Sequence, residues 1–135
     1  MIFVDTGAWY ALLDKDDQHH EAAKQWYEHN QVLLVTSNYV VVETLNLTKV
    51  RLGSRIACQW DEAFLTESIA QLLWVNQEDH QRASHFFHKY ADKGWSFTDC
   101  SSFVLMERLK INTAFAFDRH FEQYAGFTRV PAIRF

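Results

Sequence analysis

The sequence predicts an α/β fold built on a mostly parallel central sheet. Short apolar runs of strand length alternate with longer segments of helical periodicity along the whole chain. With only 4 glycines and 1 proline, no flexible linker interrupts this alternation. Several predicted strands also lead directly into carboxylates, and the carboxyl ends of parallel strands share the sheet edge where such folds bind ligands.

The 135 residues suit one domain spanning 1–135, which is long enough to bury roughly two thirds of its unfolded surface. The apolar fraction of 48% and the aromatic fraction of 16% exclude a disordered chain. A formal net charge of −4 argues against coating of nucleic acid by a broadly basic surface, but leaves room for a local basic patch.

The two cysteines, Cys58 and Cys100, make no disulfide framework and are expected to be buried, reduced thiols. No basic segment followed by an apolar core begins the chain, and no apolar run approaches the 18 residues of a membrane span. We therefore expect a soluble cytoplasmic protein with no membrane partner.

The first third of the chain reads as strand, helix, helix and strand. Residues 2–4 form an apolar run that ends at Asp5, and Thr6 can cap a short helix through residue 13. An acidic loop leads into a second helix, which ends near residue 29. Residues 31–36 predict a strand, although periodicity alone also allows a helix there.

The middle of the chain predicts two consecutive helices. Ser37 can cap a long helix that stops at Gly53, where a left-handed backbone costs little. Ser54 can begin the next helix, in which apolar residues repeat at the spacing of one buried face.

The last part continues the alternation. Apolar runs of strand length occupy residues 70–75, 95–99 and 113–117, and residues 77–93 and 99–109 have helical spacing. The end of the chain, with its sole proline at position 131, suits an edge strand.

Three acids follow predicted strands: Asp5, Asp99 and Asp118. Each has an ordinary alternative role, since Asp5 and Asp99 could cap helices and Asp118 could begin a turn. A fourth acid, Glu43, interrupts a largely apolar helix face, where it is either paired or a glutamate at a cleft edge whose head reaches water. Together the four acids favour one shared site.

Clustered carboxylates repel one another, and a hard cation removes that conflict. Oxygen ligands without supporting His or Cys favour Mg²⁺ or Mn²⁺ over zinc. Such an ion suits phosphodiester chemistry, because it binds a phosphate oxygen and activates a water nucleophile; whether one ion or two are held stays open.

Four stretches carry a resemblance to a known family: F-V-D-T-G at residues 3–7, V-V-E-T-L-N at 41–46, S-F-T-D-C-S-S-F at 96–103 and F-A-F-D-R-H-F at 115–121. Over nearly its full length the chain resembles the PIN-domain nucleases, especially the toxins of bacterial VapBC-type toxin–antitoxin pairs. The resemblance implies a three-layer α/β/α fold and metal-dependent hydrolysis of RNA, with an RNA substrate and a cognate antitoxin as partners.

The resemblance also assigns site residues. Asp5, Glu43, Asp99 and Asp118 would be the catalytic, metal-holding acids, with Asp118 the more peripheral. Thr6 and Ser101 resemble the family's hydroxyl positions beside the first and third acids. Gly7 and Trp9 depart from the family's usual small or aliphatic residues, which affects the local pocket shape rather than the ligands.

Basic side chains near these acids are either solvated or guide phosphate groups; they are Lys49, Arg51, Arg55 and Arg119. His120 could approach phosphate, although a structural or solvated role is favoured. A homodimer through the helices around Trp60 is compatible with the pattern.

Two other functions stay open. The chain could be a housekeeping RNA-processing nuclease, or a non-catalytic protein-interaction domain that keeps a PIN-like fold. The presence of all four acids argues against the non-catalytic domain. The absence of glycine-rich phosphate loops and of a G-x-S-x-G motif disfavours nucleotide-binding and serine-hydrolase functions.

Overall fold

The computed structural model describes residues 1–124 and 126–132. Within these residues five strands form one sheet: β1 (Ile2–Val4), β2 (Leu34–Ser37), β3 (Gln71–Leu73), β4 (Thr113–Phe115) and β5 (Thr128–Val130). The helices are α1 (Thr6–Leu13), α2 (His20–His29), α3 (Asn38–Leu52), α4 (Ser54–Leu65), α5 (Gln77–Lys89), α6 (Phe97–Leu109) and α7 (His120–Gln123).

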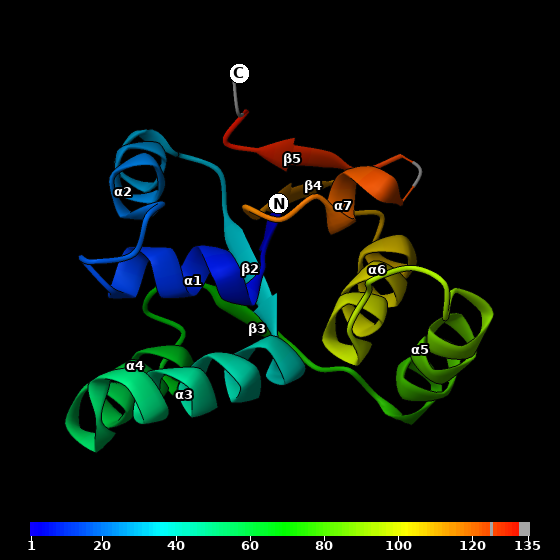
Figure 1. The fold of residues 1–135 in the computed structure, drawn as a ribbon, viewed down its shortest axis with the longest axis horizontal. Helices are drawn as coiled ribbons and strands as arrows, with labels where there is room; N and C mark the ends of the chain where they lie inside the picture. The colour runs from blue at the N-terminus through cyan, green and yellow to red at the C-terminus, as the bar shows by residue number, and fades with distance from the viewer. Residues whose placement is uncertain (125, 133–135) are drawn as a thin grey trace.

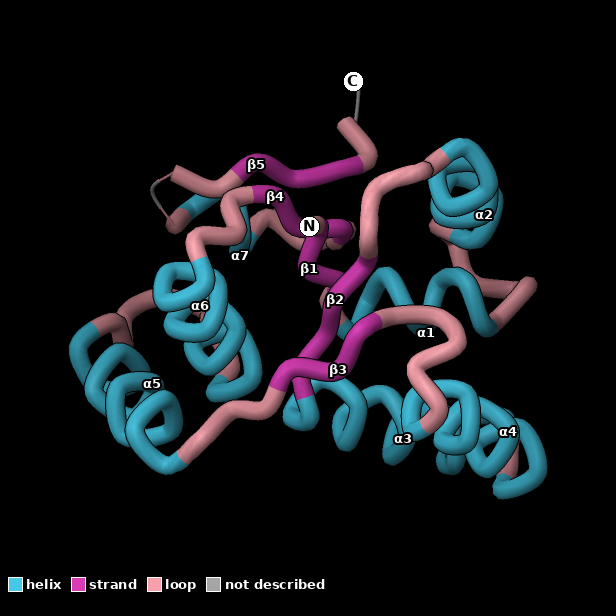
Figure 2. Tube along the Cα trace, turned by 180° about the vertical axis from the view of Figure 1, so that it is seen from behind, coloured by secondary structure: helices cyan, strands magenta, loops and turns pink. Residues whose placement is uncertain are grey.

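All the strand pairs are parallel, and the spatial order is β3-β2-β1-β4-β5. Helices α1 to α4 lie on one side of the sheet and α5 and α6 on the other, as opposite views show (Figures 1 and 2). The chain therefore has the predicted three-layer α/β/α fold. The strand order reverses direction between β1 and β4, and the carboxyl edge at such a reversal is where α/β folds bind ligands.

The largest fully buried side chains of the core are aromatic, and they lie on both faces of the sheet. On one face Trp9 packs edge-on against Phe64, with ring centroids 5.2 Å apart. On the other face Phe103 packs against Trp95 at 5.1 Å and Phe121 at 5.2 Å. Burial of these rings anchors the helices that begin at the carboxyl edge of the sheet.

A short polar chain lies inside this core. The Trp9 indole N–H donates to Thr36 Oγ1 over 3.1 Å, and the Thr36 hydroxyl donates to the Val4 carbonyl over 3.0 Å. These bonds satisfy polar groups that would be costly to bury alone. They also show that Trp9 is a core residue, which ties α1 to β1 and β2.

Most predicted element boundaries are confirmed. Helix α1 spans the predicted residues, the Ser37 side chain caps α3 by accepting from the Val40 N–H over 3.1 Å, and Gly53 ends that helix at a φ of 94°. The final strand β5 lies at an edge of the sheet, as expected, and ends just before Pro131.

The predicted strand at residues 95–99 is wrong. Ser96 caps helix α6 instead, because its side chain accepts from the Asp99 N–H while the Asp99 carboxylate accepts from the Ser96 N–H. This reciprocal pair, a capping box, starts a helix. Asp99 therefore lies in the first turn of a helix rather than at the end of a strand.

The prediction of two buried thiols is half right. Cys100 is buried, whereas Cys58 is exposed. Helix α4 turns Ala57 and Phe64 toward the core, and Cys58, one residue beyond Ala57, is rotated away from that face. In the part of the chain that the structure describes, no helix is long and apolar enough to cross a membrane.

Candidate active site

The four predicted acids come from separate elements that meet at the carboxyl edge of the sheet. Asp5 directly follows β1, Glu43 lies in the helix after β2, and Asp118 follows β4 by three residues. Asp99 reaches the same edge from the first turn of α6. Because β1 lies between β2 and β4, these segments surround the point where the strand order reverses.

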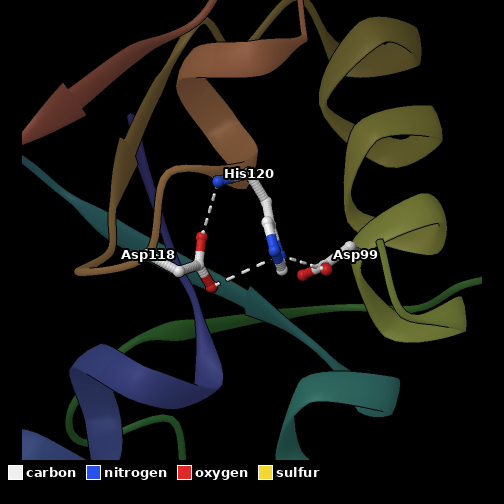
Figure 3. A group of neighbouring side chains, drawn as sticks. All are labelled: Asp99, Asp118 and His120. Atoms are coloured by element: carbon white, nitrogen blue, oxygen red, sulfur yellow. Dashed lines mark hydrogen bonds and ion pairs between the residues drawn. The ribbon is translucent and has the colours of Figure 1, made fainter. Parts of the chain in front are cut away.

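Asp99, Asp118 and His120 form the most compact part of the site (Figure 3). His120 Nδ1 lies 2.6 Å from Asp99 Oδ2 and 3.7 Å from Asp118 Oδ2, and the His120 backbone N–H donates to Asp118 Oδ1 over 3.0 Å. One potential ligand atom from each residue lies within 4.8 Å of the others. A single cation could therefore contact all three side chains.

The Asp99 carboxylate is held by two donors on the same oxygen. Its Oδ2 accepts from the Ser96 N–H over 2.9 Å and from His120 Nδ1 over 2.6 Å, since an ionised carboxylate only accepts. Neither bond uses Oδ1. Burial raises the pKa of Asp99 and the nearby Asp118 charge adds to that, while the Ser96 N–H and His120 oppose the rise.

Asp5 is the most strongly perturbed acid. Burial raises the pKa of its carboxyl well above the ordinary value, and the charges of Asp118, Asp99 and Glu43 raise it further, while a backbone hydrogen bond from Thr6 lowers it. The charges of the other three acids therefore all reach Asp5. The arrangement fits a divalent cation, which would replace this repulsion with attraction.

The Thr6 hydroxyl supports that fit. Its Oγ1 is buried and, within the described residues, has no hydrogen-bond partner. Such orphaned polar atoms are rare, and a bound water or ion would give this one a partner. The hydroxyl lies beside the acid whose charge is least compensated.

Ser101, the other predicted hydroxyl residue, has a different environment. Its Oγ is buried and donates to the Thr98 carbonyl over 2.7 Å. This bond, with the similar one from Ser102, follows the usual pattern of a hydroxyl bonding the preceding helical turn. Ser101 thus supports the first turn of α6, and of the two predicted hydroxyls only Thr6 is unpartnered.

Glu43 is exposed and lines a groove on α3. The structure therefore agrees with the interpretation of a glutamate at a cleft edge whose head reaches water. Its influence on the pKa of Asp5 shows that it lies on the side of α3 that faces the other acids. Glu43 is the most exposed of the four acids, while Asp118 is partly exposed and Asp5 and Asp99 are buried.

The predicted basic residues lie on three different segments of the chain. The Arg51 guanidinium lies over the Tyr10 ring at 5.0 Å, against α1. Lys49 and Arg55 are exposed on α3 and α4, and Arg119 directly follows Asp118. The structure thus gives Arg51 a packing contact, and a phosphate-guiding role for all four residues stays a prediction.

His120 is the site residue whose role the sequence did not predict. In the sequence, the only indication of such a role is that His120 lies two residues after Asp118. A lone histidine is more often solvated than functional. The contact with Asp99 depends on α7 folding back beside the start of α6, which Figure 3 shows.

Comparisons with known proteins agree with this fold and identify its family. The family model of the PIN domain matches residues 2–127. The 23S rRNA-specific endonuclease VapC20 of Mycobacterium tuberculosis is 33% identical over 130 residues, which cover 96% of this chain and 98% of the relative. A VapC ribonuclease of Archaeoglobus fulgidus is 26% identical over 113 residues, covering 80% of this chain and 71% of the relative.

The crystal structure of Mycobacterium tuberculosis VapC20, described as a sarcin–ricin loop cleaving toxin, superposes with a TM-score of 0.88. The matched region has 31% sequence identity and covers 95% of this chain and 97% of that one. The similarity therefore extends over both the sheet and the helices that carry the acids.

Proposed function

We propose a mechanism on the premise that this chain belongs to the PIN-domain family and is a ribonuclease of the VapC toxin type: Asp5, Glu43 and Asp99 hold Mg²⁺ or Mn²⁺, with Asp118 assisting. The observation that carries the proposal is the raised pKa of Asp5, whose buried carboxyl is surrounded by three other acids. If these acids served only to stabilise the fold, we would expect positively charged side chains of the protein to be paired with them.

The bound ion would supply Lewis-acid stabilisation of the phosphate and a more acidic water nucleophile. The chain's own residues arrange the site for it. His120 and the Ser96 N–H hold Asp99 Oδ2, and Oδ1, which neither bond uses, would be available to hold the ion. Asp118 accepts the His120 backbone N–H through Oδ1, so the loop after β4 and the start of α6 are fixed relative to each other.

An RNA-cleavage assay tests this mechanism. The purified protein with Mg²⁺ or Mn²⁺ should cleave RNA, and EDTA should stop cleavage. Asp5→Ala and Asp99→Asn should each lose activity, whereas Asp16→Asn, an exposed acid on the loop before α2, should keep it. Cleavage that persists in EDTA or in both site variants would disprove the mechanism.

The substrate to test first follows from the relatives. Since VapC20 is named for cleavage of 23S rRNA, we propose ribosomal RNA as the substrate class. Purified ribosomes, free 23S rRNA and an isolated sarcin–ricin loop should be compared with a transfer RNA mixture. Preferential cleavage of the transfer RNA would exclude ribosomal specificity while leaving the ribonuclease mechanism intact.

The toxin role implies an antitoxin that blocks the acid site. Expression of the chain alone should inhibit bacterial growth, and co-expression with the product of an adjoining gene should restore it and yield a co-purifying complex. Growth inhibition should also disappear in Asp5→Ala. Harmless overexpression of an active enzyme would instead favour a housekeeping nuclease. A homodimer, also proposed, is checked by light scattering on the same preparations.

A further inference from the structure

A groove runs along α3 directly beside the acids. It has a volume of about 680 Å³ and is lined by one face of α3, namely Tyr39, Val42, Glu43, Asn46, Leu47 and Val50, together with Thr98 of α6. This volume is in the range of small-ligand pockets. Glu43 belongs both to the groove and to the group of interacting acids, and Thr98 immediately precedes Asp99. The groove therefore adjoins the proposed phosphate site through Glu43 and Thr98.

The walls of the groove suit a flat, weakly polar ring. Val42 and Val50 are 57% and 86% exposed, so apolar surface lines the groove although water reaches it. Asn46 is exposed next to them, and within the described residues its side-chain amide has no hydrogen-bond partner. An amide in an apolar groove is suited to the donor and acceptor pattern of a nucleobase edge.

Tyr39 provides a fixed aromatic surface at one end of the groove. Its hydroxyl is hydrogen-bonded to His80 Nδ1 on α5, and its ring centroid lies 6.5 Å from that of Phe97 on α6. These contacts from two other helices hold a half-buried ring in place. A ring that is ordered before binding loses little entropy when a base stacks on it.

On the basis of the ribonuclease function above, we propose that this groove binds an unpaired base of the substrate RNA next to the phosphate that is cleaved. The base stacks on Tyr39, and Asn46 hydrogen-bonds its edge. Proteins read RNA mainly through unpaired bases held in this way. The position of the groove beside the acids favours this occupant, because the nucleotide beside a phosphate at Asp5 and Asp99 must lie along an adjoining wall.

The test uses a pool of single-stranded RNA oligonucleotides of random sequence, with cleavage sites mapped by sequencing. Tyr39→Leu should raise KM about tenfold with little change in kcat, since one stacked base contributes roughly 1 to 3 kcal/mol. Tyr39→Phe keeps the stacking ring but loses the hydrogen bond to His80, so its KM should lie between those of the unmodified protein and Tyr39→Leu. Asn46→Ala should flatten the base preference at one position flanking the cut. Tyr27→Leu, on α2, is the matched control.

Binding of a fluorescent oligonucleotide in EDTA, measured by anisotropy, separates this inference from the ribonuclease function. Binding that weakens in Tyr39→Leu would support the groove even if no RNA were cleaved. No RNA binding, or unchanged KM and base preference in both Tyr39→Leu and Asn46→Ala, would overturn it. Loss of self-association or of antitoxin binding in these variants, with RNA cleavage unchanged, would also overturn it and make the groove a protein interface.

Discussion

Helices α5 and α6 both begin with a capping box, but the aspartates of the two boxes lie in opposite electrostatic environments. In each, a polar cap residue and an aspartate three positions later exchange hydrogen bonds: Asn76 with Asp79 in α5, and Ser96 with Asp99 in α6. Asp79 is then paired with Arg108 through two bonds of 2.8 Å. Asp99 instead lies near the other acids, with only His120 as a side-chain partner.

The difference shows how one motif serves two purposes. The Asp79 carboxylate is 1% exposed, and its charge is balanced by the Arg108 guanidinium and the Asn76 N–H. The Asp99 group lacks such a balance and shares its surroundings with the buried Asp5. The local sequence therefore determines where each helix begins. The partner from a distant part of the chain determines whether the carboxylate stabilises the fold or is available to bind a cation.

The largest expected effect is on the paired carboxylate. Asp79→Asn should lower the free energy of unfolding by about 3 kcal/mol, the low end for a broken buried pair, because Arg108 is partly exposed. Urea unfolding in EDTA measures this, with the exposed Asp92→Asn as control. If Asp5→Asn lowered the free energy of unfolding by the same amount in the same buffer, the proposed difference between the Asp79 and acid-site carboxylates would be wrong.

Divalent cations should act on the acid site alone. Mg²⁺ or Mn²⁺ at a hundred times its dissociation constant should add about 2.7 kcal/mol to the free energy of unfolding, because binding removes repulsion around Asp5. Thermal unfolding with and without the ion measures the gain, which EDTA should reverse. Asp79→Asn should retain the gain and Asp5→Asn should lose it; equal gains in both variants would place the ion elsewhere.

His120 should affect metal affinity through Asp99. His120→Gln moves the donor away from the Nδ1 position and should weaken Mn²⁺ binding about tenfold, whereas His120→Asn keeps a donor near that position and should bind the ion better. Isothermal titration calorimetry reports this without an activity assay. Equal affinities for both variants would mean that the hydrogen bond to Asp99 does not position the carboxylate.

The smallest effect is a pH dependence of stability in the metal-free protein. The pKa of Asp5 is raised in the folded state, so between its unfolded value near 3.8 and the raised folded value the native state holds more protons. Stability from this group therefore falls as pH rises through that window. In EDTA, the stability advantage of Asp5→Asn should grow from pH 4.5 to pH 8, and a constant difference would refute the raised pKa.

Sequence patterns predicted the five strands and the caps at Ser37 and Gly53, because these features depend on near neighbours. The roles of the four acids stay a prediction. The sequence patterns failed at residues 95–99, where the aromatic run resembles a strand. There Trp95 packs on Phe103 and Ser96 begins a helix. The bonds from His120 to Asp99 and from Arg108 to Asp79 were also missed, since each joins residues more than 20 positions apart.

The hydrogen bond from the Asp5 N–H to the Phe115 carbonyl, 3.0 Å long, bears on when activity arises during synthesis. This bond joins Asp5 to β4, the strand that precedes Asp118. In the sheet, β4 lies between β1 and the edge strand β5. While β4 is still inside the ribosome during synthesis, the chain cannot form this bond, and Asp118 has not yet emerged. A complete acid site can thus form only after the ribosome has released the chain through Asp118.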